Sequence, residues 1–366
     1  MVGKMLEVNR SVTQIHWGGG TPNALSIAQI ADIMNLIHKT FNINQNTEIA
    51  IECNPAYLTT DYVESLMKMG FNRVSLGIQD FDVNVLKRVN RDPSKLPIEE
   101  LTEILRKHNA GINLDFIYGL PGQTVKSFTQ TIEKAIEVRP DRMVTFSYAH
   151  VPWVKSHQTP LESMGLPSPT DKLSMYESAY NLITQNTDYQ PIGLDHYALS
   201  TDQLSIAINK GMLHRNFQGY CTRETTGQVY AFGMSAISQL KGIYAQNTKN
   251  TKQYMEMVNN GDLPIERGYQ LTEEEYAIGE IITELMCNNY LNWESTANRL
   301  NSSVDDLKSI TQYNADKMRG FEKDGLLVIN EDSLTVTESG RFTIRNIVSI
   351  LDSKLNVGEK RFSKSI

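Results

Sequence analysis

Short apolar runs alternate with longer amphipathic stretches along the first half of the chain, from Val12 to about Leu199. The amphipathic stretches have the length and the spacing of helices. This alternation is typical of βα units around a parallel sheet. We therefore predict an α/β fold with strands at residues 13–17, 48–52, 73–78, 113–118, 142–147 and 190–194.

The ends of several helices can be predicted from their capping residues. Ser26 is suited to cap a helix over residues 27–41, and Thr60 is suited to cap a helix that ends at Gly70. A third helix begins at Pro97. Because the pattern opens on a strand with no βα unit before it, we predict that the α/β part, residues 1–200, lacks its first βα unit.

The pattern changes in the last third of the chain. Residues 201–270 are less regular, and we predict that they form a separate segment. Helices are expected at 273–286, 293–300 and 304–323, followed by a hairpin over 325–337. Residues 271–366 are therefore predicted to form a helical, winged-helix-like domain. Such units often bind DNA, but the low positive charge here favours a packing or lid role.

Composition narrows the classes of partner. The 366 residues are 40% hydrophobic and carry a formal net charge of −7, with no long basic run. We therefore expect no nucleic acid or anionic membrane as a partner. The opening decapeptide is charged and no 18 apolar residues run together, which predicts a cytoplasmic protein. The three cysteines are far apart in sequence, which suits a reducing compartment.

Polar or glycine-rich residues follow several of the predicted strands. The run GGGTP at 18–22 would let the backbone approach a ligand closely, although a tight turn is the favoured explanation when the run is taken alone. Glu52, Gln79 and Asp115 lie at or near strand ends, where parallel α/β folds form their sites. Arg91 is a possible partner for a ligand carboxylate. The recurrence at one structural position favours a shared pocket.

Two further segments offer candidate substrate contacts. His214, Arg215 and Tyr220 lie in HRNFQGY at 214–220, where cations and aromatic rings would suit a tetrapyrrole with propionates. The alternative is a solvated loop with a buried Phe217. Asp195 and His196 could form an acid–base pair, or they could simply end a strand with the histidine satisfied internally.

Several of these segments together resemble one enzyme family. They are IHWGGGTP at 15–22, GFNRVSLGIQDF at 70–81, VNR at 89–91, LDFIYGLP at 114–121, YAH at 148–150, GLDHYA at 193–198, HRNFQGY at 214–220 and SAIS at 235–238, with 340–347 and 361–366 toward the end. In this order they resemble the oxygen-independent coproporphyrinogen III oxidases (dehydrogenases) of the radical S-adenosylmethionine (SAM) class.

The resemblance implies a fold, cofactors and a reaction. The fold is a partial (βα) barrel over residues 1–200, extended on the substrate side by residues 201–270, with a helical C-terminal domain. The cofactors are SAM and a [4Fe-4S] cluster. A 5′-deoxyadenosyl radical abstracts hydrogen from a propionate of coproporphyrinogen III, and oxidative decarboxylation leaves a vinyl group, twice over, to give protoporphyrinogen IX in haem biosynthesis. An electron donor protein is implied as a partner. By the resemblance, the residues that contact SAM are Gly19, Gly20, Thr21, Glu52, Gln79, Arg91, Asp115, Ala149 and Ile237.

The resemblance also implies three clustered cysteines, C-x3-C-x2-C, ahead of the glycine-rich turn. This sequence has no such run, and the spacing of Cys53, Cys221 and Cys287 does not replace it. We therefore expect no metal ligands in this chain, cluster ligands upstream of residue 1, and an inactive, N-terminally truncated chain. No individual catalytic residue is assigned.

Two other functions were weighed. A haem-binding relative of the same family, without dehydrogenase activity, would share the barrel, but the HRNFQGY segment resembles the dehydrogenase. An ordinary barrel lyase or aldolase would need a Schiff-base lysine or a metal triad at the strand ends, and the sequence shows neither.

Overall fold

A computed structural model describes residues 11–225 and 227–355, which form two compact units. The first unit holds residues 11–191 and 195–202, and the second holds residues 192–194 and 203–355. Segment 361–366, which contributes to the resemblance, lies outside the described residues. The predicted subdivision of residues 201–366 at position 270 stays a prediction.

The first unit is built on a seven-stranded sheet in the order β1-β2-β3-β4-β5-β7-β6. The first five strands run parallel, and β7 pairs antiparallel with β5. The strands are β1 (Ser11–Trp17), β2 (Asn42–Cys53), β3 (Arg73–Gln79), β4 (Gly111–Tyr118), β5 (Arg142–Ser147), β6 (Tyr189–Ile192) and β7 (His196–Leu199). The predicted parallel α/β pattern is confirmed, whereas β7 and the first part of β2 were not predicted.

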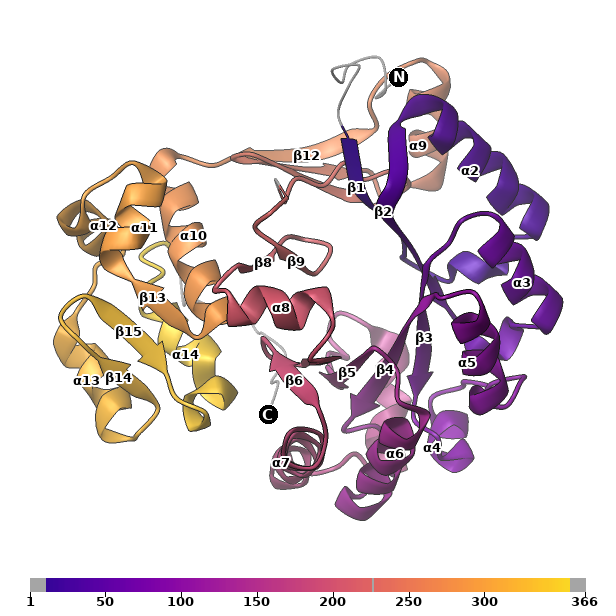
Figure 1. Cartoon of the computed structure of the whole chain (residues 1–366), viewed down its shortest axis with the longest axis horizontal. Coiled ribbons are helices and arrows are strands. Elements are labelled where there is room, and N and C mark those ends of the chain that lie inside the picture. Colours follow the sequence, from indigo (N-terminus) through magenta and orange to yellow (C-terminus); the bar gives the residue numbers. More distant parts are fainter. Residues whose placement is uncertain (1–10, 226, 356–366) are drawn as a thin grey trace. The chain divides into compact units, whose positions relative to one another are not determined.

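Helices of the first unit connect these strands, and α2, α3, α5 and α6 lie along the same side of the sheet (Figure 1). The helices are α2 (Ile27–Thr40), α3 (Thr60–Lys68), α4 (Val83–Arg88), α5 (Ile98–Lys107), α6 (Val125–Val138) and α7 (Pro169–Gln185). Ser26 caps α2 as predicted, and its hydroxyl accepts from Gln29 N. The cap predicted at Thr60 is wrong, because Thr59 accepts from Tyr62 N and Thr60 is the first helical residue.

Strands β3 and β4 have two unlike faces because their side chains alternate. Leu76 and Leu114 belong to the buried set, and both are fully buried. Ser75, Gly77 and Asp115 belong to the alternate set and are only partly buried. The period of two therefore places the polar residues on the face opposite to the apolar core.

The second unit contains three small antiparallel sheets, β8-β9, β10-β11-β12 and β13-β15-β14. Its elements are α8 (Gln203–Asn209), β8 (Leu213–Arg215), β9 (Tyr220–Thr222), β10 (Ile237–Leu240), β11 (Ile243–Asn247), α9 (Thr251–Asn259), β12 (Ile265–Gln270), α10 (Glu273–Asn288), β13 (Tyr290–Asn292), α11 (Trp293–Leu300), α12 (Val304–Ile310), α13 (Ala315–Lys323), β14 (Leu327–Ile329), β15 (Ser333–Val336) and α14 (Ile344–Ser349). The hairpin predicted near residues 325–337 is confirmed, and the winged-helix-like assignment stays a prediction.

One helix prediction in this unit is wrong. The stretch 304–323 is not continuous but forms α12 and α13. The break has a local cause: Gln312 adopts a positive φ of 49°, and the Asn314 side chain accepts from Lys317 N to start a new helix. Because asparagine is a favoured N-cap, a new helix starts here although the apolar period of the sequence continues across the boundary.

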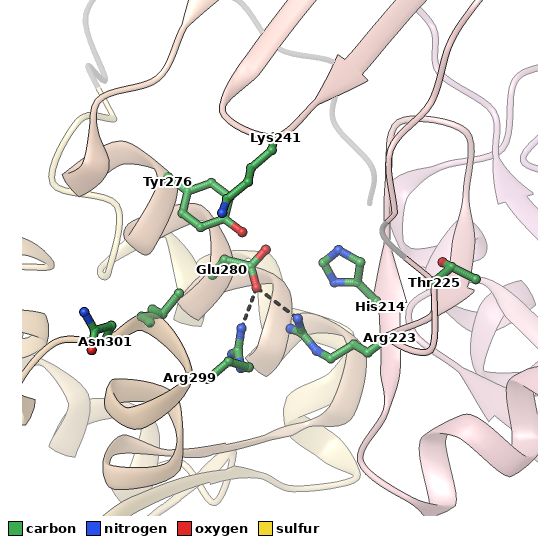
Figure 2. Close-up of a pocket in the computed structure, with 9 residues that line it drawn as sticks. His214, Arg223, Thr225, Lys241, Tyr276, Glu280, Arg299 and Asn301 are labelled. Carbon is green, nitrogen blue, oxygen red and sulfur yellow. Dashed lines mark hydrogen bonds and ion pairs between the residues drawn. The ribbon is translucent and has the colours of Figure 1, made fainter. Parts of the chain in front are cut away.

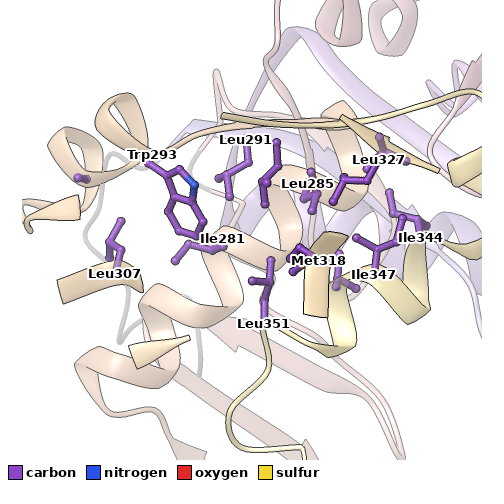
Figure 3. Packing of buried hydrophobic residues seen from close by; sticks show 14 residues of the cluster. Ile281, Leu285, Leu291, Trp293, Leu307, Met318, Leu327, Ile344, Ile347 and Leu351 are labelled. Atoms are coloured by element: carbon purple, nitrogen blue, oxygen red, sulfur yellow. The ribbon is translucent and has the colours of Figure 1, made fainter. Parts of the chain in front are cut away.

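The core of the second unit gathers around α10 and Trp293 (Figure 3). Trp293 is 1% exposed and packs edge-on against Tyr313, with ring centroids 5.3 Å apart. Lys308 Nζ lies 5.6 Å from the centroid of the Trp293 ring. The apolar faces of α10, α11, β13 and β15 therefore meet at one large aromatic side chain.

We predict that Trp293→Ala lowers the free energy of unfolding of the second unit by about 3–5 kcal/mol, because it leaves a cavity in a closed core. Urea titration followed by far-ultraviolet circular dichroism measures this loss. The matched control is Tyr290→Ala, since Tyr290 is 45% exposed and only three residues away. Equal losses for the two variants would contradict the assigned core.

Candidate functional site

The polar face of the first unit's sheet carries the candidate site, and strand register decides which side chains become neighbours. Glu52 of β2 pairs with Ser75 of β3, and Gly77 of β3 pairs with Asp115 of β4. On the other side, Asp115 pairs with Val144 of β5, which pairs with His196 of β7. Polar groups from β2, β3, β4 and β7 are thus brought to one face.

Glu52 links the end of β1 to the glycine-rich turn that follows it. Its Oε1 lies 2.9 Å from His16 Nε2, and its Oε2 accepts from Gly19 N at 3.4 Å. The hydrogen bond from His16 lowers the pKa of Glu52 below its ordinary value, against the effect of burial. Glu52 is therefore an anion held in place at the turn.

The three glycines of this turn have different roles. Gly19 and Gly20 have positive φ angles of 77° and 64°, which L side chains rarely adopt, and a Cβ atom on either would meet open space. Gly18 has no such angle, but a Cβ there would lie 2.8 Å from Glu52 Oε1 and 2.9 Å from His16 Nε2. The missing side chain at Gly18 thus leaves room for the contact between His16 and Glu52.

Asp115 is the second carboxylate of this face. Burial raises its pKa to about 6, while the hydroxyl of Ser75, which donates to Oδ2 at 2.7 Å, lowers it. The charge of His196 also favours the ionised form, and Glu52 opposes it. The charges of His16, Glu52 and His196 are thus close enough to affect Asp115.

Gln79 and Arg91 converge on Gly77 at the end of β3. Arg91 NH2 donates to Gly77 O at 2.6 Å, and a Cβ on Gly77 would lie 2.8 Å from Arg91 NH2 and 2.9 Å from Gln79 Nε2. Gln79 has a positive φ of 66° at a shift in the register of β3 and β4. Burial lowers the pKa of Arg91, and Asp115 is one of the charges that raise it.

The remaining residues expected to contact SAM are spread over both units. Thr21 directly follows the glycine turn and accepts from Ala24 N through its carbonyl. Ala149 lies in the loop after β5, where its carbonyl accepts from Gln158 Nε2 at 3.2 Å. Ile237 begins β10, which belongs to the second unit. Sequence reasoning missed His16 and Ser75, although His16 lies within the IHWGGGTP segment and Ser75 shares the alternation of β3.

The predicted substrate residues also divide between the units. Asp195 and His196 lie in the first unit, with His196 Nδ1 2.6 Å from Asp195 Oδ1. The backbone carbonyl of Asp195 accepts from Thr145 N at 2.8 Å, which ties the pair to β5. His214, Arg215 and Tyr220 lie in the second unit.

The residues of the HRNFQGY segment differ in their exposure along the β8–β9 hairpin. Arg215 is exposed, and its guanidinium lies 5.1 Å from the centroid of the Tyr220 ring. Tyr220 is buried, and its hydroxyl accepts from Leu194 N at 3.1 Å. Phe217 is 59% exposed, so the alternative of a loop with a buried Phe217 is wrong. The hairpin thus exposes one cation and one aromatic ring.

His214 lines a pocket of about 380 Å³ within the second unit (Figure 2). Its lining is mostly polar or charged and includes Arg223, Lys241, Glu280 and Arg299. Glu280 Oε2 accepts from Arg223 at 2.9 Å and from Arg299 at 2.6 Å. Arg223 follows the HRNFQGY segment closely in sequence, and the structure pairs it with two carboxylates of α10.

The first unit fits an adenosyl ligand. The glycine turn presents backbone without side chains, and Glu52, Asp115 and Gln79 offer acceptors and donors for hydroxyl and amino groups. His16 and the backbone N–H of Gly19 hold the carboxylate of Glu52 beside the turn. This combination suits the ribose or the amino acid moiety of SAM.

The cysteines do not fit an iron–sulfur cluster. Burial raises the pKa of the Cys53 and Cys287 thiols to about 12 and that of Cys221 to about 11, whereas a cluster requires thiolates. In the part of the chain that the structure describes, no three histidine, cysteine or acidic side chains group as metal ligands would. None of the helices over residues 11–225 and 227–355 has the length and apolar character of a membrane span.

Comparison with known proteins gives three kinds of match. Residues 1–135 match the Radical SAM superfamily. The chain is 36% identical to the oxygen-independent coproporphyrinogen III oxidase of Helicobacter pylori (strain J99), which covers 99% of this chain and 78% of that protein. It is 38% identical to the Escherichia coli (strain K12) protein of the same name, over 96% of this chain and 76% of that protein.

A solved structure agrees with these matches. The coproporphyrinogen III oxidase from Escherichia coli, described as a radical SAM enzyme, aligns with a TM-score of 0.86 and 37% identity. The alignment covers 94% of this chain and 79% of that chain. The predicted radical SAM fold and its cofactors, SAM and a [4Fe-4S] cluster, are confirmed for the family. On identity sustained along nearly its whole length, the chain belongs to the oxygen-independent coproporphyrinogen III oxidase family of radical SAM enzymes.

Proposed function

We propose that this protein acts on coproporphyrinogen III, converting two of its propionates to vinyl groups by oxygen-independent oxidative decarboxylation. The observation that carries this proposal is the 36–38% identity to oxidases of that name over almost the entire chain. The relatives reported above are named oxidases, which favours this activity over that of a haem-binding relative.

The adenosyl ligand is proposed to bind at the glycine turn of the first unit. Bound SAM supplies the hydrogen-abstracting chemistry of this enzyme class. The chain's own residues bind and orient it: Gly19 and Gly20 allow close approach of the backbone, while Glu52 and Asp115 accept hydrogen bonds. Thr21, Gln79, Arg91 and Ala149 complete the proposed set in this unit, which rests on the resemblance and, for Gln79 and Arg91, on their convergence at Gly77. Ile237, which lies in the second unit, stays a prediction from the resemblance.

We predict that Gly18→Ala weakens the binding of S-adenosylhomocysteine about tenfold, because the new methyl group displaces Glu52 and His16 from each other. Isothermal titration calorimetry measures the affinity. Gly320→Ala is the control, since a Cβ at Gly320 would meet nothing within 4 Å. Unchanged affinity in Gly18→Ala would contradict the role of the turn.

The carboxyl group of Asp115 costs stability where it stands. Its pKa of about 6 in the folded protein lies above its ordinary value, so the folded state binds its proton more tightly than the unfolded state does. Stability from this group therefore falls as the pH rises through the interval between the ordinary value and about 6. The retention of a destabilising carboxylate beside Glu52 favours a role in binding.

We predict that Asp115→Asn raises the free energy of unfolding at pH 7.5 by roughly 1 to 2 kcal/mol, because the amide needs no ionisation. At pH 4 the difference should nearly vanish, since the carboxyl group is then mostly protonated in the folded protein. Urea unfolding at the two pH values tests this. A gain in stability of the same size at both pH values would argue against a raised pKa.

Substrate recognition is proposed to involve the exposed end of the β8–β9 hairpin. A guanidinium can pair with a propionate carboxylate, and an aromatic ring can stack on a tetrapyrrole face. Arg215 and Phe217 are exposed together there. Tyr220 is proposed to support Arg215 from below through its ring, and Asp195, His196 and His214 stay predicted substrate contacts.

We predict that Arg215→Ala weakens the binding of coproporphyrin III about tenfold and leaves the affinity for S-adenosylhomocysteine unchanged, because one carboxylate loses its partner. Porphyrin fluorescence titration measures this. Arg319→Ala in α13 is the control, since Arg319 is exposed and pairs only locally with Asp316. Equal porphyrin affinity for both variants would contradict the assignment.

Three further expectations from the sequence stay predictions. They are the electron donor protein as a partner, a cytoplasmic location, and the inactivity of this chain by itself. Three cysteines without a disulfide among them agree with a reducing compartment.

A further inference from the structure

The β8–β9 hairpin has an exposed tip and a base that is fixed to α10. Arg215 and Phe217 lie at the tip, where Asn216 Oδ1 accepts from Gln218 N and Gly219 N to shape the turn. The base is formed by residues at either end of the hairpin, outside the turn. All of these elements belong to the second unit.

The first contact that fixes the base is between the side-chain amide of Asn288 and the backbone of β8. Leu213 N donates to Asn288 Oδ1 at 3.1 Å, and Asn288 Nδ2 donates to Leu213 O at 3.0 Å. Asn288 Nδ2 also donates to Glu284 Oε1 at 2.9 Å. The side chain of one α10 residue thus takes the place of a neighbouring strand for Leu213, and Glu284 orients it.

The second fixation is a ring of four charges next to β9. Arg223 NH1 lies 2.9 Å from Glu280 Oε2, and Arg223 NH2 lies 2.9 Å from Glu284 Oε2. Arg299 NH1 and NH2 reach the same two oxygens at 2.6 and 3.0 Å. Figure 2 shows Arg223 and Arg299 both directed at Glu280. Two guanidinium groups therefore share two carboxylates that are four residues apart on one face of α10.

The ring is largely shielded from water, so the attraction between its charges is stronger than in an exposed ion pair. The side chains of Arg223, Glu280 and Glu284 are 13–15% exposed. Burial lowers the pKa of Arg223, yet Glu284 and Glu280 raise it above its ordinary value. Because a guanidinium is planar, two bonds to two fixed carboxylates set both the position and the direction of the Arg223 side chain. Arg223 N also donates to Met212 O at 2.9 Å, which ties this fixation to the residue just before β8.

We propose that Arg223 is a positioning residue for substrate binding: without contacting the tetrapyrrole, it holds the β8–β9 hairpin so that Arg215 and Phe217 meet the substrate. This inference rests on the proposed function. The fixed base and the exposed tip are joined by only two three-residue strands, so a change at the base alters the direction of the tip. Arg223 therefore acts through Arg215.

The test is a double-mutant cycle with coproporphyrin III as the fluorescent probe. Arg223→Gln replaces the guanidinium with a shorter, neutral amide, and we expect about tenfold weaker binding of coproporphyrin III. In the Arg215→Ala background the same substitution should change the affinity less than about twofold, because the group that it positions is already gone. Additive losses would overturn the proposal, and so would wild-type affinity in Arg223→Gln.

Three further measurements separate the outcomes. Arg319→Gln is the matched control for removing an arginine charge from this unit, and it should bind as the wild type does. If Arg223→Gln does not fold, Arg223→Lys replaces it, since an ammonium keeps the charge but cannot bridge two carboxylates in a plane; the same non-additivity is required. If Arg215→Ala binds the porphyrin normally while Arg223→Gln does not, the assignment of Arg215 under the proposed function fails, and with it the positioning role.

Discussion

The contact between His16 and Glu52 depends on the parallel register of β1 and β2, and the fixed acceptor beside the glycine turn depends on this contact. It joins the end of one strand to the end of the next and holds a carboxylate beside the glycine turn. Hydrogen bonding keeps Glu52 ionised despite its partial burial. An acceptor that is fixed before a ligand arrives loses little entropy on binding, which is the advantage of a preorganised site.

Two carboxylates of the same face have opposite electrostatic states. The pKa of Glu52 is lowered by a donor from His16, whereas burial raises the pKa of Asp115. The difference follows from their partners, since Asp115 has one hydroxyl from Ser75 and no paired cation at hydrogen-bond distance among the contacts described above. A site with one firmly ionised and one reluctantly ionised carboxyl group can serve ligand groups of different charge.

In the second unit, a short hairpin with an exposed end must be held in place. Two three-residue strands provide few backbone hydrogen bonds, so the hairpin needs outside support. Helix α10 supplies this support. Its residues Ile281 and Leu285 pack in the apolar core. Its polar residues Glu280, Glu284 and Asn288 hold the base of the hairpin. The amphipathic period of one helix thus links the stability of the unit to the direction of the HRNFQGY segment.

The sequence by itself determined the first five strands, the cap at Ser26, the motif order and the family, because alternation, capping and motif spacing are local properties. It placed Glu52 and Asp115 at strand ends for the same reason. It did not determine that His16 serves Glu52 or that Ser75 serves Asp115, since strand register joins residues 36 and 40 positions apart. It also misjudged the helix break after α12, where one asparagine cap outweighs an apolar period.

Only the tertiary structure decided the surroundings of the two arginines near residue 220. Arg215 and Arg223 look alike in the sequence, as two positive charges that flank an aromatic segment. The fold exposes the first and gives the second two carboxylates from α10, 57 and 61 positions away. The local sequence pattern does not contain this information. The role of a charged side chain depends on the groups that surround it in space, and those groups come from distant parts of the chain.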